Sequence, residues 1–204
     1  MKNQRDIIIA VDAMGGDLGP SAAINGALAA SKNFSNIKYI FFGDKKKVAP
    51  LIKKDFFKIS EIIHTEQLIT NDIKPTEALR KYRKSSMFKA IESVKLGKAN
   101  AVVSSGNTGA LMVISTVLIK TVPGISRPAI ASMFPTKNSE TVMLDLGANI
   151  ECNEKNILDF AIMGNVFCKT VLGIKKPKIG ILNVGSEISN IVNFGNLKAY
   201  FRLF

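Results

Sequence analysis

The chain has 204 residues, 47% of them apolar and 22% charged, which excludes disordered and fibrous classes and allows one sizeable hydrophobic core. Its 28 lysine and arginine residues outnumber 16 aspartate and glutamate residues, and the net charge of +12 attracts anionic partners such as phosphate, nucleic acid, acidic protein or lipid headgroups. Cys152 and Cys168 have neither a CxxC spacing nor a nearby histidine, so the sequence predicts no metal site and no redox pair. The basic N-terminal segment is followed by only five apolar residues before Asp12, too few for an export signal, so we expect a cytoplasmic protein.

Short apolar segments alternate with longer helical patterns along the chain, and this alternation is typical of a parallel sheet covered by helices. The expected fold class is therefore α/β, with a mostly parallel sheet and helices on both faces. Helices are expected to begin near Pro20, Lys45, Ser86, Thr108 and Lys155. Strands are expected at Ile7 to Val11, Tyr39 to Phe42, Ile59 to Ile63, Ala101 to Ser104, Ala129 to Phe134, Val142 to Leu146 and Lys178 to Asn183.

The segment from Thr65 to Lys84 has the least regular pattern and is interrupted by Pro75, so we expect a surface loop there. It carries a basic group that is either a solvated face or a docking site for an acidic partner. Because the chain carries no recognised nucleic-acid-binding motif, a nucleic-acid partner is not expected. The members of this group are Arg80, Lys81, Arg83 and Lys84.

Two polar turns follow expected strands and precede expected helices. One runs from Ser104 to Gly109, with the sequence SSGNTG, and the other runs from Asp12 to Pro20. Such turns present backbone N–H groups and hydroxyls at a helix N-terminus, where the helix dipole favours negative charge. The sequence therefore predicts an anion cradle.

Two further polar turns, residues 145–149 (DLGAN) and 183–187 (NVGSE), also follow expected strands. Ligands of parallel sheets bind outside the carboxyl ends of the strands, so we expect the four turns to converge on one crevice. The spacing of Gly15, Gly16 and Gly19 matches no dinucleotide fingerprint, and the chain has no nucleotide-binding P-loop motif. The expected ligand is thus a small anion.

Each polar residue of these turns also has a structural interpretation. Asp12 and Asp145 are as well suited to holding turns as to chemistry, and Ser104 and Ser105 lack the surroundings of a nucleophile elbow. Arg127 is either an anion clamp or a surface ion-pair partner. His64 has no orienting partner in the sequence, and a structural role is expected for it.

Six segments taken together resemble the PlsX family of phosphate acyltransferases of bacterial phospholipid synthesis. The resemblance extends from Ile9 to about Glu187, in the order IAVDAMGGDLGP, VVSSGNTGALM, RPAIASMFPT, LDLGANIEC, FAIMGNVF and GILNVGSE. It implies transfer of a fatty acyl group from acyl carrier protein to inorganic phosphate, without a cofactor. It also implies a fold like that of isocitrate and isopropylmalate dehydrogenases, a homodimer, and peripheral association with the inner face of the cell membrane.

The resemblance assigns roles to residues of the four turns. Ser105 and Asn107, with Asp12 of the neighbouring wall, are the expected catalytic residues. The basic group defined above is expected to meet the acidic carrier protein. Phosphate or substrate contacts are expected from Gly15, Gly16, Gly106, Thr108, Gly109, Asn149 and Asn183.

The sequence departs from the family after Glu187, where the family continues with an acidic residue, a lysine-glycine pair and a long helix. Residues 188–193, ISNIVN, replace that pattern. We therefore expect residues 1–187 to be the N-terminal part of a single acyltransferase domain and residues 188–204 to be a divergent tail of a truncated chain. The alternative is an inactive remnant that binds phosphate or carrier protein.

Overall fold

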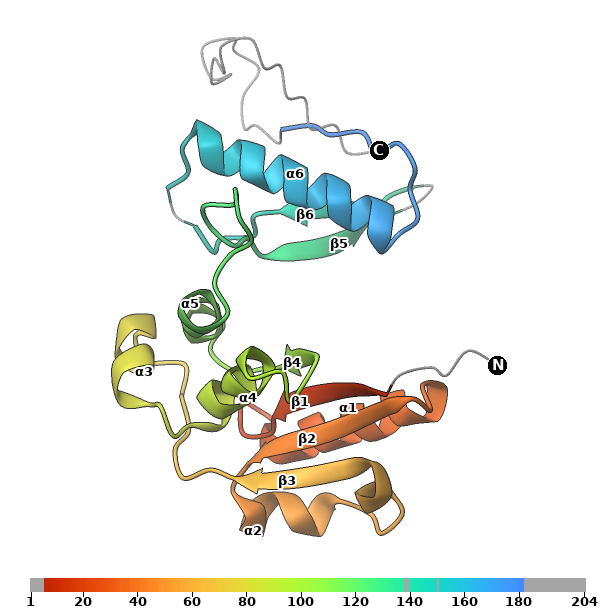
Figure 1. The fold of residues 1–204 in the computed structure, drawn as a ribbon, viewed down its shortest axis with the longest axis vertical. Coiled ribbons are helices and arrows are strands. Elements are labelled where there is room, and N and C mark those ends of the chain that lie inside the picture. Colours follow the sequence, from red (N-terminus) through yellow and green to blue (C-terminus); the bar gives the residue numbers. More distant parts are fainter. Residues whose placement is uncertain (1–5, 138–139, 150, 182–204) are drawn as a thin grey trace. The chain divides into compact units, whose positions relative to one another are not determined.

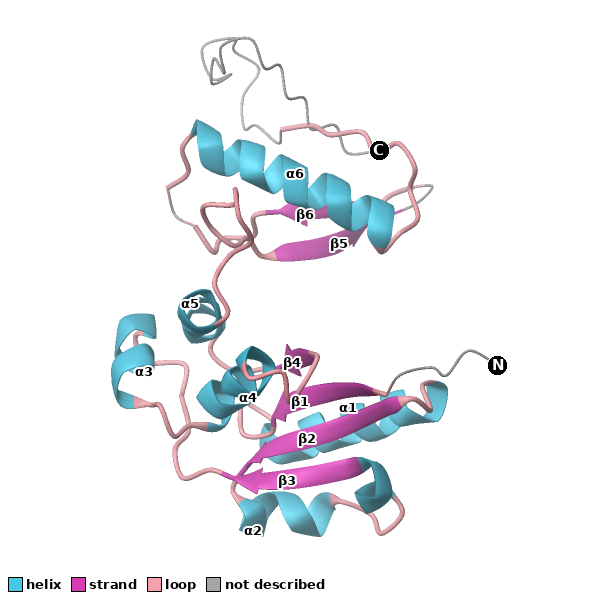
Figure 2. Cartoon of the chain, viewed as in Figure 1, coloured by secondary structure: helices cyan, strands magenta, loops and turns pink. Residues whose placement is uncertain are grey.

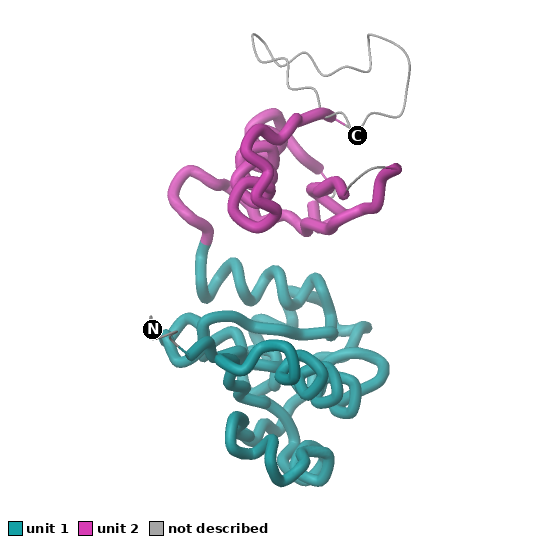
Figure 3. The backbone as a smooth tube through the Cα atoms, turned by 90° about the vertical axis from the view of Figure 1, so that its right-hand side faces the viewer, with its two compact units in different colours: residues 1–120 teal, residues 121–204 magenta. Residues whose placement is uncertain are grey.

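The computed structural model describes residues 6–137, 140–149 and 151–181 (Figure 1). Its contacts divide the chain into two compact units, residues 1–120 and residues 121–204, coloured teal and magenta in Figure 3. The assignment of residues 1–187 to a single domain stays a prediction. Each unit is described by itself.

Unit 1 contains a four-stranded parallel sheet with the strand order β3-β2-β1-β4 (Figure 2). In the central strand β1, Val11 lies beside Phe41 of β2 and Val103 of β4. The mostly parallel α/β architecture expected from the sequence is confirmed. The strands are β1 (Ile7–Asp12), β2 (Ile37–Gly43), β3 (Ser60–His64) and β4 (Ala101–Val103).

Helices cover both faces of this sheet. Val11 and Phe41 pack on one face against α1 (Gly19–Asn33) and α2 (Lys45–Val48). Ala10 and Phe42 pack on the other face, where they meet Ala90 of α4 (Ser86–Lys95). Successive side chains of a strand point to opposite faces, so a continuous apolar run fits a strand buried on both sides. This explains why the strands of unit 1 were predictable from short apolar segments.

The loops of unit 1 contain elements that the sequence did not predict. Between β2 and β3 the chain forms two short 3-10 turns, η1 (Ala49–Leu51) and η2 (Phe56–Ile59). Residues 75–81, expected to be part of a loop, form the helix α3 (Pro75–Lys81), so the loop prediction is wrong there. Pro75 occupies the first helical turn, where its missing N–H has no helical partner and its fixed φ suits the helix. The proline therefore begins a helix instead of interrupting a loop.

Three helices of unit 1 share a second hydrophobic cluster. It joins α3 and α4 to α5 (Thr108–Leu118). The start of α4 follows the sequence prediction, and the Ser85 hydroxyl caps it by accepting the N–H of Phe88. Gly97 has a left-handed φ of 70° just after the helix. The buried members of the cluster are Ile69, Ala78, Met87, Phe88, Ile91, Ala110 and Ile114.

Unit 2 contains an antiparallel pair, β5 (Ala131–Pro135) and β6 (Glu140–Leu144), and the long helix α6 (Glu154–Thr170). A parallel arrangement was expected for these two strands, and a short connection such as residues 136–139 instead allows an antiparallel hairpin. The expected strand from Lys178 to Asn183 lies partly outside the described residues. Its described part, residues 178–181, is not in a strand.

Candidate functional site

The loops that follow β1 and β4 are joined by hydrogen bonds. The Ser104 hydroxyl donates to Oδ2 of Asp12 at 2.7 Å, and the Ser105 hydroxyl donates to the carbonyl oxygen of Gly15 at 3.0 Å. Asp12 is only 2% exposed and also accepts the N–H of Met14. Two of the four turns expected to converge therefore do meet, because β1 and β4 are parallel neighbours.

Glycines make this contact between the two loops possible. A Cβ atom on Gly15 would lie 2.6 Å from Asp12 Oδ2 and 2.8 Å from the Gly106 nitrogen. A Cβ on Gly16 would lie 2.8 Å from the Ser105 carbonyl oxygen, and Gly16 has a φ of 84° that side-chain-bearing residues rarely adopt. The two backbones thus approach more closely than any larger residue permits.

Ser104 fixes the path of the loop that we call the anion loop, residues 104–109. Its hydroxyl donates to Asp12 and accepts the N–H of Gly106 at 3.1 Å, so it acts both as a donor and as an acceptor within the protein. The structural interpretation of Ser104 fits these contacts. The N–H of Gly106 already has a partner and is not a free donor for a ligand.

The N-terminus of α5 lies at the end of the anion loop. Asn107 is its N-cap residue, and Oδ1 of Asn107 accepts the N–H of Ala110 at 2.9 Å. Within the described residues, the N–H groups of Thr108 and Gly109 donate to no acceptor. The side chains of Ser105 and Thr108 are exposed beside them. The two N–H groups and the Thr108 hydroxyl are the donors available to an anion, because the Ser105 hydroxyl already donates its hydrogen to the Gly15 carbonyl.

The basic group near α3 is exposed, but its members differ in their partners. Lys81 pairs with Glu77 at 3.0 Å, and Lys84 pairs with Glu66 at 3.6 Å. Among the described residues, the Arg80 and Arg83 side chains have no partner. The two guanidinium groups are therefore the charges most available to an acidic partner.

The turn after β6 lies in unit 2. Oδ2 of Asp145 accepts the N–H of Asn149 at 2.7 Å, and Oδ1 accepts the N–H of Ile130 at 2.8 Å. Burial raises the pKa of Asp145, but these hydrogen bonds outweigh it and hold the pKa below its ordinary value. Asn149 also donates from Nδ2 to the Pro128 carbonyl. The contribution of Asn149 to the anion site stays a prediction, and Asn183 lies outside the described residues.

The remaining polar residues discussed above have structural contacts. His64, at the end of β3, accepts the N–H of Lys45 at its Nδ1 atom, which fits the expected structural role. Arg127 is exposed and donates to the backbone carbonyl of Glu151 at 3.3 Å, which is not an ion pair. Over the described ranges, no three His, Cys, Asp or Glu side chains are placed to share a metal ion. In those same residues, no helix has the length and apolar character needed to cross a bilayer.

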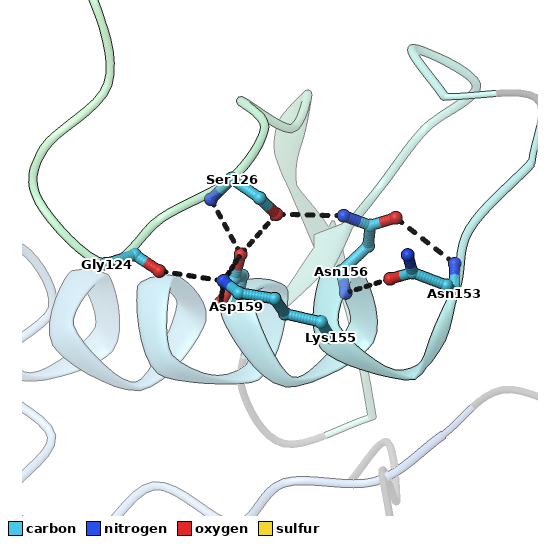
Figure 4. A network of polar contacts seen from close by, with 6 residues as sticks. All are labelled: Gly124, Ser126, Asn153, Lys155, Asn156 and Asp159. Carbon is cyan, nitrogen blue, oxygen red and sulfur yellow. Dashed lines mark hydrogen bonds and ion pairs between the residues drawn. The ribbon is translucent and has the colours of Figure 1, made fainter.

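Unit 2 contains a polar network that the sequence did not predict (Figure 4). Asp159 of α6 is 3% exposed, and its Oδ2 accepts both the hydroxyl and the N–H of Ser126, at 2.6 and 2.8 Å. Lys155 bridges Asp159 and the Gly124 carbonyl. The Asn153/Asn156 spacing is a recognisable capping box, and Asn156 donates to the Ser126 hydroxyl. The network fastens the loop before β5 to α6.

We expect this network to make unit 2 sensitive to acid. The hydrogen bonds from Ser126, then the nearby Lys155, hold the pKa of Asp159 below its ordinary value. Its stabilising contribution is complete above the unfolded-state pKa of about 3.9 and is lost as the pH falls through the lower folded-state pKa. Amide exchange in α6, followed from pH 7 to pH 3, should show faster opening in acid, and Asp159→Asn should weaken this dependence.

Asp55→Asn serves as the control for this measurement, because the Asp55 side chain is 95% exposed and forms an exposed ion pair with Lys58. It should leave the acid dependence of α6 unchanged. An Asp159→Asn chain that keeps the full acid dependence would show that other carboxyl groups are responsible.

The sheet of unit 1 places the chain among α/β proteins with a mostly parallel sheet, a class in which ligands bind outside the carboxyl ends of the strands. Its fold is similar to that of EutD phosphotransacetylase from Staphylococcus aureus, with a TM-score of 0.57 and 17% sequence identity over 86% of this chain and 56% of that one. Residues 7–199 match the family described as fatty acid synthesis protein. The chain belongs to this family.

Curated relatives point to the same family. The chain is 47% identical over 183 residues to a phosphate acyltransferase of Paramagnetospirillum magneticum, covering 89% of this chain and 52% of the relative. It is 51% identical over 181 residues to a phosphate acyltransferase of Rhodospirillum centenum, covering 88% of this chain and 51% of the relative. The chain thus spans about half the length of the curated relatives that it matches.

Proposed function

We propose that this chain takes part in transferring a fatty acyl group from acyl carrier protein to inorganic phosphate. The names of the relatives support an acyltransferase with phosphate as acceptor. One structural observation carries the proposal. Hydrogen bonds hold the anion loop against Asp12 and Gly15, and the N–H groups of Thr108 and Gly109 at the start of α5 have no acceptor in the described part of the chain. An anion at this position gains from the free donors and from the helix dipole.

In the proposed reaction, a phosphate oxygen attacks the carbonyl carbon of the acyl thioester. A C–O bond forms, the C–S bond breaks, and the pantetheine leaves as a thiolate that takes up a proton from water. Phosphate dianion is a competent nucleophile near neutral pH, so positioning and stabilisation of the oxyanion supply much of the rate. The Thr108 and Gly109 N–H groups and the Thr108 hydroxyl would hold the phosphate and the oxyanion, and Ser105 would hold the loop in place through its bond to the Gly15 carbonyl. Asp12 contributes by holding Ser104.

The proposed docking surface for the carrier protein consists of Arg80, Lys81, Arg83 and Lys84. Arg80 and Lys81 belong to α3, whose first residue, Pro75, lies against the anion loop: a Cβ on Gly109 would be 2.8 Å from Pro75 Cγ. An acidic carrier bound here would arrive next to the phosphate. Because exposed ion pairs are weak, the partners of Lys81 and Lys84 are easily exchanged.

We also propose that the protein is a cytoplasmic homodimer that associates peripherally with the membrane. Two surface features support this. Leu158, Ile162 and Val166 of α6 form an exposed apolar row at helical spacing, suited to a second subunit. A lysine-rich segment, residues 45–58, is suited to anionic lipid and has half-exposed Leu51 and Phe57 among its charges. Light scattering would report a dimer, and flotation with anionic and neutral vesicles would report lipid binding.

One assay tests the proposed function. The purified chain is incubated with an acyl carrier protein thioester and phosphate, and acyl phosphate is trapped as the hydroxamate. We expect product that depends on phosphate and falls with Arg80→Glu plus Arg83→Glu, while Lys53→Glu plus Lys54→Glu serves as the charge-matched control. Phosphate binding without turnover would instead favour a chain that only binds its ligands. Binding of neither ligand would refute both functions.

A further inference from the structure

We propose that Asn107 is a positioning residue that fastens residues 70–73, and with them the start of α3, to the anion loop. This role differs from direct contact with the substrate. The positioning role itself is independent of the proposed function; its expected effect on phosphate binding rests on that function.

The contacts of the Asn107 carboxamide account for all of its hydrogen-bonding groups. Oδ1 accepts the Ala110 N–H. Nδ2 lies 2.9 Å from the Ile73 carbonyl oxygen, 3.1 Å from that of Thr70 and 3.4 Å from that of Asn71. An amide nitrogen has two hydrogens, so three carbonyl oxygens already exceed its capacity. A phosphate contact from this group would require one of these bonds to break.

The held segment is attached to both loops of the proposed site. Asn71 donates from Nδ2 to Oδ1 of Asp17, in the loop after β1, at 3.4 Å. Pro75 follows directly and lies against Gly109, where a Cβ would be 2.8 Å from Pro75 Cγ. Residues 70–75 therefore bridge the loop after β1 and the start of α5. The Asn107 bonds to Ile73 and Thr70, at 2.9 and 3.1 Å, are shorter than the bond between Asn71 and Asp17.

The other end of α3 is held separately. Gln67 donates from Nε2 to the Lys81 carbonyl and accepts the Lys84 N–H at its Oε1 atom. Gln67 thus holds the C-terminal end of α3, and Asn107 holds residues 70–73, which lead into its N-terminal end. Because α3 has only seven residues, little stability comes from the helix itself. Its place relative to the anion loop depends on these two attachments and on the shared hydrophobic cluster.

The test compares two N-cap asparagines. Asn107→Ser keeps an oxygen that can cap α5 but removes the donors to residues 70–73. Asn153→Ser is the matched control, because Asn153 also caps its helix through Oδ1 and its Nδ2 has no acceptor among the described residues. Hydrogen exchange is followed at Ile73, Glu77 and Ala78, whose N–H groups are bonded within residues 70–78. Phosphate affinity is measured on the same samples by calorimetry.

We expect Asn107→Ser to raise exchange at the three reporter amides about tenfold, to leave the later turns of α5 protected, and to weaken phosphate binding several-fold. Asn153→Ser should change none of these. Lost phosphate binding with unchanged exchange at residues 73–78 would identify Asn107 as a direct ligand and overturn the proposal. Unchanged exchange and unchanged binding would overturn it as well.

A substitute variant and a second measurement keep the positioning role testable if the first variant or the phosphate measurement fails. If Asn107→Ser does not fold, Asn107→Asp takes its place, since it retains the capping oxygen and lacks the amide donors. If the unmodified chain binds no phosphate, the proposed function fails, whereas the exchange at Ile73, Glu77 and Ala78 still decides the positioning role.

Discussion

Gly15→Ala is expected to separate the two loops of the proposed site, with a loss of about 1–3 kcal/mol of stability and at least a tenfold loss of phosphate affinity. The added Cβ would lie 2.6 Å from Asp12 Oδ2, 2.8 Å from the Gly106 nitrogen and 3.0 Å from the Gly106 Cα. Two of these atoms belong to backbone, which cannot turn aside as a flexible side chain does. Relief therefore requires the anion loop to move away from β1.

Gly26→Ala provides the control for this substitution. Gly26 lies inside α1 with no atom within 4 Å of its ideal Cβ, so alanine should stabilise the helix by about 0.5–1 kcal/mol. Urea unfolding and phosphate calorimetry on both variants give the comparison. A Gly15→Ala chain with unchanged stability would show that the loops tolerate separation. Unchanged phosphate affinity would remove the anion loop from the proposed site.

The parts of the fold that the sequence predicted are those governed by local rules. The parallel strands of unit 1 were recognisable because residues on both faces are apolar, as with Ala10 and Val11. The start of α4 near Ser86 was predicted, and the preference of serine for the N-cap position explains why the helix begins there. The meeting of the loops after β1 and β4 followed from a general property of parallel sheets.

The remaining features depend on contacts between residues far apart in the sequence. Asn107 was identified as a site residue, but its bonds to residues 70–73 have no sequence signature. The Ser126–Asp159 bond joins a loop to a helix, and no sequence spacing predicts that these two residues meet. Proline breaks a helix when it lies in the interior but is favoured in the first turn. Pro75 was expected to be such a break, whereas it lies in the first turn of α3. Only the position of the helix start distinguishes these cases.

Phe41→Ala is expected to cause the largest loss of stability, about 3–5 kcal/mol. Phe41 is 0% exposed and lies in the cluster between the sheet and α1, where its ring contacts Tyr39 and Phe56 with centroids 6.1 Å apart in both cases. Removing the ring leaves a cavity that β1, β2 and their covering helices cannot close without shifting. Because β1 ends at Asp12, a shift of this strand also reaches the anion loop.

Phe34→Ala also removes a phenyl ring, but Phe34 is 54% exposed. Its removal therefore exposes little buried apolar surface and leaves no closed cavity. We expect a loss below about 1 kcal/mol for this control. Urea unfolding followed at an amide of β2 reports both values, and equal slopes would show that the unfolded states are comparable. If the two substitutions cost the same, the stability of unit 1 does not come from the cluster around Phe41. The Asp12–Ser104 bond attaches the anion loop to the sheet. In that case something other than the sheet would have to keep this loop rigid.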